Sequence, residues 1–320
     1  SVTRMRQVMG TLLEISVESK DNAAAEHAVS AVFDEVERWD SILSNHKEDS
    51  ELSQLNSNPR QGVVSDDMFH FVSTARYWSE RTNGAFDVTV EPLTRLWHLR
   101  ERTLDRIPAN KEIAAARALV GYRYIAVSSS AHSVLFSFDG MGLDTGGIGK
   151  GYALDRAMEK MRNFEMESCT LNFGGQILHW SAERRVFEVG VKNPVSPGNL
   201  YKTYQVKSPF SPFSFSTSAN YERYVTVSSG IVRVGHILDP RTGRPVDNEI
   251  LSVTVIYPDG TGADVMAKAV FVNGRERGQA FIDLNRSAAA LILYKGPGGQ
   301  LMEQVSANWK KWCLAKEAKP

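Results

Sequence analysis

A glycine-rich segment, GMGLDTGGIGKG (residues 140–151), is the densest chemical signal in the chain. Glycines let a backbone approach a ligand closely and present N–H groups to it. A strand pattern precedes the segment and a helical pattern follows it, so the helix N-terminus could bind a phosphate. Lys150 would add a positive charge, whereas the carboxylate of Asp144 suits a sugar hydroxyl or a metal ion. The alternative to a ligand-binding loop is a glycine-rich connection that binds no ligand, and composition alone does not decide between the two.

Known nucleotide and hydrolase motifs do not account for this segment. A Walker A loop needs glycine at the position of Asp144 and serine or threonine at the position of Gly151. No GxGxxG opens the helix, and the sequence has no GxSxG and no HExxH. The sequence therefore lacks the motifs of the usual phosphate-loop proteins and of the common hydrolases.

Three further groups of polar residues could take part in chemistry. The first, NFGG (residues 172–175), is a second glycine site that a turn after a strand also explains. The second, HILDPRTGRP (residues 236–245), is a strand that runs into a Pro/Gly turn and carries His236. The third is Asp264 with Lys268, which the i, i+4 spacing places on one helix face, where a solvated salt bridge is the simplest explanation.

Helix and strand patterns alternate along the chain and would position these residues. Helices are predicted over residues 23–43, from a cap at Ser65 to a stop at Asn83-Gly84, over residues 108–119, directly after the glycine segment, and over residues 263–272. Strands are predicted within residues 6–18, 133–139, 170–173, 186–191, 201–207, 231–238, 251–257 and 288–294. The uncharged residues 208–221 are expected to form a loop or a pocket wall.

This mixture of helix runs and strand runs predicts an α+β fold with largely antiparallel sheets. We expect one domain over residues 1–320, or two closely packed subdomains with a boundary near residues 130–145. The aromatic residues Tyr77, Trp78, Phe86 and Trp97 could stack on a planar ring, although aromatic residues at such spacing more often form core.

Composition narrows the class of protein further. The 320 residues contain 37 Lys plus Arg and 37 Asp plus Glu, so bulk charge does not hold the chain to nucleic acid or an anionic membrane. The only cysteines are Cys169 and Cys313, and the absence of CxxC excludes zinc-ribbon and thioredoxin motifs. No apolar run approaches the ~18 residues of a membrane span. Because the sequence begins with Ser1, we expect a mature or trimmed chain from which any export signal is missing.

Eight motifs in one order resemble the ApbE family, the FAD:protein FMN transferases. They are MGT (residues 9–11), DSELSQLN (49–56), TNGAFDVTVEPLTRLW (82–97), LDTGGIGKGYALD (143–155), NFGGQI (172–177), STSANYERY (216–224), HILDPRTGRP (236–245) and ADVMAKAVFVNG (263–274). The resemblance implies an α+β protein that cleaves FAD at its diphosphate, joins FMN by a phosphoester to Thr or Ser of a target protein, and releases AMP.

The resemblance also implies cofactors, partners and location. Magnesium is the expected metal, a flavoprotein subunit of a membrane electron-transfer system is the expected acceptor, and the periplasm is the expected compartment. Two alternatives stay open: an FAD-binding, flavin-supplying protein without transferase activity, and an FAD diphosphatase that yields FMN and AMP.

Site residues follow from the same resemblance, position by position. Magnesium would be held by the backbone oxygen of Gly147 and by Asp264, completed by Ala267 and position 268. His46 stands where the family often has tyrosine. His236 or Asp239 is the candidate for removing the proton of the acceptor hydroxyl. Contacts to flavin and adenosine would come from Met9, Ala85, Phe86, Asp87, Asp144, Lys150 and Ile237.

Position 268 departs from the family pattern. The family usually has threonine there, whose hydroxyl can bind a hard cation, but this chain has Lys268. A protonated lysine only donates hydrogen bonds and cannot be a magnesium ligand. We therefore hypothesise that Lys268 partly replaces the metal ion, pairs with Asp264 and offers its charge to the FAD diphosphate. A smaller departure is Ala219, where glycine is common.

Overall fold

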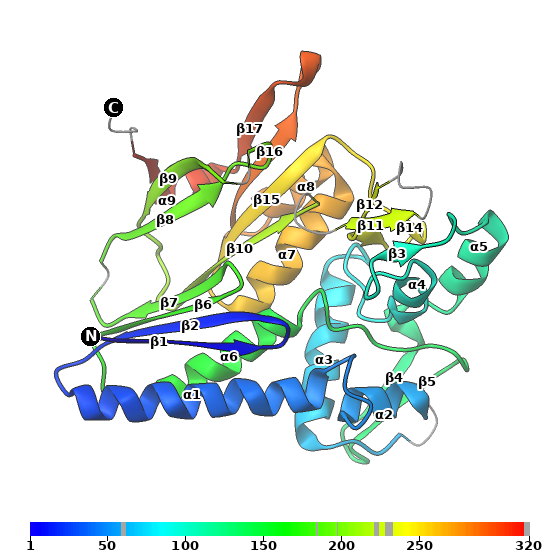
Figure 1. Ribbon diagram of the computed structural model, residues 1–320, viewed down its shortest axis with the longest axis horizontal. Coiled ribbons are helices and arrows are strands. Elements are labelled where there is room, and N and C mark those ends of the chain that lie inside the picture. The colour runs from blue at the N-terminus through cyan, green and yellow to red at the C-terminus, as the bar shows by residue number, and fades with distance from the viewer. Residues whose placement is uncertain (59–61, 184, 197, 221–223, 228–232, 317–320) are drawn as a thin grey trace. The chain divides into compact units, whose positions relative to one another are not determined.

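The computed structural model describes residues 1–58, 62–183, 185–196, 198–220, 224–227 and 233–316 (Figure 1). The chain forms two compact units. Unit 1 comprises Ser1–Arg38, Lys150–Ala219 and Asn248–Pro320, and unit 2 comprises Trp39–Gly149 and Asn220–Asp247. Among the described residues, we find no helix with the length and apolar character needed to cross a bilayer.

Unit 1 is built on an eight-stranded sheet with the order β1-β2-β6-β7-β10-β15-β16-β17, in which every neighbouring pair is antiparallel (Figure 1). A smaller antiparallel sheet has the order β18-β9-β8. The strands are β1 (Val2–Val8), β2 (Thr11–Glu18), β6 (Ser168–Phe173), β7 (Gln176–Ser181), β8 (Phe187–Lys192), β9 (Leu200–Val206), β10 (Phe213–Ala219), β15 (Ile250–Tyr257), β16 (Ala289–Lys295), β17 (Leu301–Val305) and β18 (Cys313–Ala315).

Helix α7 packs against β10 and β15 of the large sheet and is buried along almost its whole length. Its sequence, GTGADVMAKAVFVN, supplies small and apolar side chains on all sides, so any charge within the helix needs a partner. The helices of unit 1 are α1 (Asn22–Leu43, with residues from 39 onward counted in unit 2), α6 (Gly149–Met161), α7 (Gly260–Asn273), α8 (Arg275–Asp283), α9 (Ala307–Trp312) and the 3-10 turn η2 (Pro297–Gly299).

Unit 2 consists of short helices and small sheets around its own apolar cluster. Its helices are α2 (Glu51–Ser57), α3 (Asp66–Arg81), α4 (Glu91–Leu96), α5 (Asn110–Ala118) and the 3-10 turn η1 (Tyr122–Tyr124). Its strands are β3 (Thr103–Leu104), β4 (Ile125–Ser128), β5 (Ser133–Phe136), β11 (Tyr224–Val227), β12 (Arg233–Gly235), β13 (Leu238–Asp239) and β14 (Arg244–Pro245). Strand β3 runs parallel to β11, and the cluster contains Leu93, Trp97, Leu104, Ile113, Val225, Val227 and Leu238.

The α+β class and the long predicted elements are confirmed. Helix α1 reproduces the predicted helix within one residue at its start, and Ser65 caps α3 by accepting a hydrogen bond from the Met68 N–H at 3.2 Å. On α6 the apolar face consists of buried Leu154, Ala157, Met158 and Met161. Of the four aromatic residues considered, Trp78, Phe86 and Trp97 are buried and Tyr77 is exposed.

Three strand predictions need correction. Residues 6–18 are not one strand, because Met9 and Gly10 adopt left-handed φ angles and turn β1 into β2. Residues 208–220 contain β10 rather than only a loop, since hydroxyls within this strand find partners inside the sheet: the Ser214 hydroxyl donates to the Ile177 carbonyl at 2.9 Å. The predicted strand over residues 231–238 is split between β12 and β13. Residues 221, 231 and 232 of these predictions lie outside the described part.

Helices α6 and α7 touch through two glycines of unit 1. A Cβ on Gly151 would lie 2.3 Å from the Gly260 carbonyl oxygen, and a Cβ on Gly260 would lie 2.6 Å from the Gly151 oxygen. Both distances are far below contact, so only glycine permits this backbone approach. The first turns of α6 and α7 are therefore held directly against each other.

We predict that Gly151→Ala lowers the free energy of unfolding by about 1–3 kcal/mol, because the added methyl group forces two helix backbones apart. Gly198→Ala is the matched control: nothing lies within 4 Å of its Cβ position, so its effect should stay within ~0.5 kcal/mol. Urea titration of both variants measures the difference. Equal stability of the two variants would show that the helices do not depend on this contact.

Candidate functional site

In unit 1, a carboxylate of α6 fixes the first turn of α7. Asp155 accepts hydrogen bonds from the Gly260 N–H at 2.6 Å and the Thr261 N–H at 2.8 Å. The Gln176 amide donates to the Gly260 carbonyl at 2.8 Å. Burial raises the pKa of Asp155, and the neighbouring Asp259 carboxylate raises it further. These bonds, together with the glycine contact, set the position of every side chain that α7 presents.

Asp264 lies one turn into α7 and forms an ion pair with Lys268. Asp264 is 2% exposed, and the Lys268 ammonium donates to its Oδ1 atom. The other oxygen, Oδ2, is buried and has no hydrogen-bond partner among the described residues. A Cβ on Gly151 would lie 3.0 Å from the Asp264 Cβ atom. The i, i+4 contact is thus confirmed, but Asp264 is buried and Lys268 is half-buried, so the pair is not the fully solvated salt bridge of the simplest explanation. The pair adjoins the end of the glycine segment.

In unit 2, two asparagine side chains hold the start of the glycine segment. The Asn45 and Asn56 amides donate to the Leu143 carbonyl at 3.1 and 2.9 Å, and the Leu143 N–H donates to Asn56 Oδ1 at 2.7 Å. The Thr145 hydroxyl donates to Asn45 Oδ1 at 2.9 Å. The loop backbone is therefore shaped before any ligand arrives.

Asp144 of this segment is paired with a cation that sequence reasoning missed. The Arg100 guanidinium donates to Asp144 Oδ2 at 3.0 Å and forms a bidentate pair with the buried Glu91. The Gly146 N–H donates to Asp144 Oδ1 at 2.7 Å. Burial raises the pKa of Glu91 because it disfavours the charged carboxylate, and the Arg100 guanidinium stabilises that charged form. The charge of Asp144 is thus balanced within unit 2.

Asp87 is held by the backbone of unit 2. It accepts hydrogen bonds from the Thr89 N–H at 2.9 Å, the Thr89 hydroxyl at 2.6 Å and the Tyr122 N–H at 2.9 Å. Burial raises the pKa of Asp87. Its neighbours Ala85 and Phe86 are buried as well. The carboxylate of Asp87 is therefore fully engaged by backbone and hydroxyl donors of unit 2.

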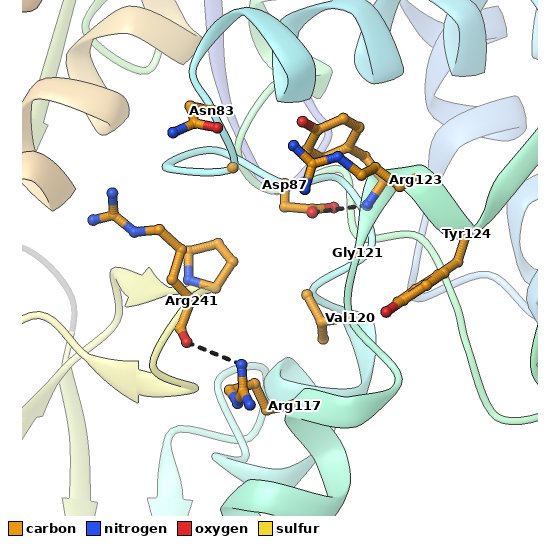
Figure 2. A pocket seen from close by; sticks show the side chains of 11 residues that line it. Asn83, Asp87, Arg117, Val120, Gly121, Arg123, Tyr124 and Arg241 are labelled. Carbon is orange, nitrogen blue, oxygen red and sulfur yellow. Dashed lines mark hydrogen bonds between the residues drawn. The ribbon is translucent and has the colours of Figure 1, made fainter.

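Asp87 lines a pocket of unit 2 with a volume of about 270 Å³ (Figure 2). Three arginine side chains line the pocket, and the Arg117 guanidinium donates to the Arg241 carbonyl at 3.3 Å. A small anion would suit these charges. The lining is Asn83, Gly84, Asp87, Arg117, Val120, Gly121, Tyr122, Arg123, Tyr124, Pro240 and Arg241.

The segment with His236 leads to the same pocket through Arg241. His236 is half-buried between β12 and β13, and Ile237 beside it is buried. Asp239 accepts hydrogen bonds from Arg241, at 2.9 Å from Nε and 3.0 Å from a terminal nitrogen. Asp239 is therefore already engaged as an acceptor.

The remaining predicted residues fall on defined elements. Met9 is half-buried in the β1–β2 turn, His46 is exposed after α1, and Ala267 is fully buried inside α7. The units contain the predicted residues as follows: Met9, Lys150, Asp264, Ala267 and Lys268 in unit 1, and His46, Ala85, Phe86, Asp87, Asp144, Gly147, His236, Ile237 and Asp239 in unit 2.

The donor set of α7 does not fit the expected magnesium ion. Magnesium requires several oxygen ligands in octahedral geometry. On α7, Lys268 stands where a hydroxyl ligand would be, and its ammonium already binds Asp264 Oδ1. No group of three or more His, Cys, Asp or Glu side chains able to hold a metal occurs among the residues described.

Comparison with known proteins defines the family. The ApbE family model matches residues 9–292. The chain therefore belongs to the ApbE family, and the resemblance of its eight motifs is confirmed.

Relatives and solved structures agree with this assignment. A protein from Klebsiella pneumoniae named FAD:protein FMN transferase is 30% identical, with 90% of this chain and 87% of that protein covered. The Escherichia coli protein of the same name is 26% identical, and the match covers 97% of this chain and 89% of that protein. The ApbE protein from Thermotoga maritima superposes with a TM-score of 0.83 at 29% identity, covering 97% and 98%. The flavin transferase ApbE from Vibrio cholerae has a TM-score of 0.81 and 26% sequence identity, and the match covers 97% of this chain and 98% of that chain.

We predict that Arg100→Met lowers the free energy of unfolding by about 2–4 kcal/mol, because it leaves the carboxylates of Glu91 and Asp144 without their shared cation. Arg95→Met is the control, since Arg95 lies 3.6 Å from the same Glu91 but is largely exposed, and should cost less than about 1 kcal/mol. Chemical denaturation measures both. If the two variants were equally stable, Arg100 would not be the cation that the glycine segment requires.

Proposed function

We propose that this chain is an FAD:protein FMN transferase. One arrangement in unit 1 carries the proposal: the glycine contact of α6 and α7 brings the end of the glycine segment beside the Asp264–Lys268 pair. Such a backbone, with Lys150 in the first turn of α6, places a helix N-terminus and a positive charge where they favour phosphate oxygens. Membership of the ApbE family, whose relatives carry this name, identifies FAD as the phosphate compound.

The reaction exchanges the phosphoanhydride bond of FAD for a phosphoester bond to the acceptor. The oxygen of an acceptor Thr or Ser attacks the phosphorus on the FMN side of FAD, the bond from that phosphorus to the bridging oxygen breaks, and AMP leaves with that oxygen. Such transfer depends on alignment and on neutralisation of phosphate charge more than on covalent help from the protein. In this chain Lys150 and Lys268 supply that charge, and the α6 amides orient the phosphates.

The acceptor hydroxyl must lose its proton during the attack. The family resemblance supports His236 as the proposed base for this proton. The carboxylate of Asp239 is bound by Arg241. Asp239 then has a positioning role in the turn that follows His236. Met9, His46, Ala85, Phe86, Asp87, Asp144 and Ile237 remain the proposed contacts to flavin and adenosine.

The acceptor and the compartment complete the proposal. A flavoprotein subunit of a membrane electron-transfer system is the proposed acceptor, and the periplasm is the proposed location. The family resemblance implies magnesium, but the α7 donor set does not fit this ion, so the proposed transfer relies on the charges of the protein's own side chains.

Incubation with FAD and an unflavinylated subunit of a bacterial membrane electron-transfer complex tests the function. We expect a covalently fluorescent subunit and one AMP for each FMN attached. Release of free FMN and AMP without labelling would instead favour the diphosphatase, and unchanged bound FAD would favour the flavin carrier.

We predict that His236→Ala slows FMN transfer by about 10²–10⁴-fold without loss of FAD binding, because the attacking hydroxyl keeps its proton. His27→Ala, which removes an exposed histidine of α1, is the control and should transfer FMN at the normal rate. Single-turnover labelling measures the rates, and calorimetry measures the binding. An unchanged transfer rate in His236→Ala would eliminate this assignment.

A further inference from the structure

The charge within helix α7 has a single cationic partner among the described residues. Asp264 is 2% exposed inside a helix that is buried on nearly all sides. A buried carboxylate is tolerated only if another charge or several hydrogen bonds compensate it. The ion pair with Lys268 provides that compensation.

The other donors near the start of α7 are already in use. The N–H groups of Gly260 and Thr261 bind Asp155, and the Gly262 N–H binds Asp259, the N-cap. They are therefore not available to Asp264. Its remaining oxygen, Oδ2, has no partner in the described part of the chain. Among the described residues, Lys268 is therefore the side chain that compensates the charge of Asp264.

The Lys268 ammonium is also able to reach a ligand. Its side chain is 20% exposed, whereas that of Asp264 is 3% exposed, so the cation lies on the outer side of the pair. An ammonium carries three N–H donors, and the pair with Asp264 uses one. The others suit oxygens of a phosphate or diphosphate.

We propose that Lys268 takes the place of a divalent cation in this chain. Its ammonium, anchored by Asp264, binds the diphosphate of FAD, so that the protein binds FAD without added metal. The identity of the ligand rests on the proposed function. A divalent ion at Asp264 would meet a positive charge one side chain away, and this repulsion opposes its binding.

The first experiment uses the unaltered protein. Calorimetry measures the Kd of FAD in excess chelator and in saturating magnesium, and we expect a change of less than about threefold. An affinity for FAD that rises tenfold or more with magnesium would overturn the inference while leaving the proposed function intact. Absence of FAD binding in both conditions would overturn the proposed function and the inference together.

The second experiment replaces the ammonium at position 268 with a hydroxyl that can bind a metal ion. Lys268→Thr restores a hydroxyl ligand and removes the ammonium, so FAD binding should weaken about tenfold or more in chelator and recover with magnesium. Lys202→Thr is the matched control, because Lys202 of the same unit pairs with Glu303 at 2.8 Å and should leave FAD binding unchanged. If Lys268→Thr binds FAD in chelator as well as the unaltered protein does, Lys268 has no such role.

The affinity of the protein for Mn²⁺ alone tests the role of Lys268 without relying on FAD binding. Electron spin resonance with Mn²⁺ alone should show binding to Lys268→Thr about tenfold or more tighter than to the unaltered protein, since the competing charge is gone. Should Lys268→Thr fail to fold, Lys268→Gln removes the charge at similar length and must still weaken FAD binding in chelator. Equal Mn²⁺ affinity with and without the ammonium would contradict the proposal.

Discussion

The close approach of Gly151 to Gly260 is the constraint on which the unit 1 site depends. Because neither residue has a side chain, the first turns of α6 and α7 meet backbone to backbone. Asp155 then bridges the same two helices through the N–H groups of Gly260 and Thr261. Lys150 and Asp264 are placed by this junction, so the end of the glycine segment and the Asp264–Lys268 pair are held next to each other within unit 1.

A second property is that carboxylates in both units carry their own cations. Asp264 is paired with Lys268 on α7, and Asp144 is paired with Arg100 in unit 2. In each unit the cation offsets part of the free-energy cost of holding a carboxylate away from bulk water.

Local patterns predicted the elements that carry the site, but not the contacts that fix it. Helical spacing identified α1, α3, α6 and α7, and the glycine segment was recognised by composition. The bond from Gly260 to Asp155 spans 105 positions and that from Arg100 to Asp144 spans 44, and no local pattern encodes such pairs. Strand β10 was missed because its serines suggested a loop, whereas within the sheet the Ser214 hydroxyl donates to the Ile177 carbonyl of the neighbouring strand β7. The motif also showed that position 268 was unusual and suggested its pairing with Asp264, and the structure added that the carboxylate is buried while the lysine side chain is 20% exposed.

The central claim is that the ammonium of Lys268 replaces a metal ion beside Asp264. Crystals grown with FAD and Mn²⁺, measured at the manganese absorption edge, test it most directly. The account predicts no anomalous peak at Asp264 and a Lys268 Nζ atom within hydrogen-bond distance of a diphosphate oxygen. A manganese ion bound by the Asp264 carboxylate, with the lysine side chain turned away, would contradict it.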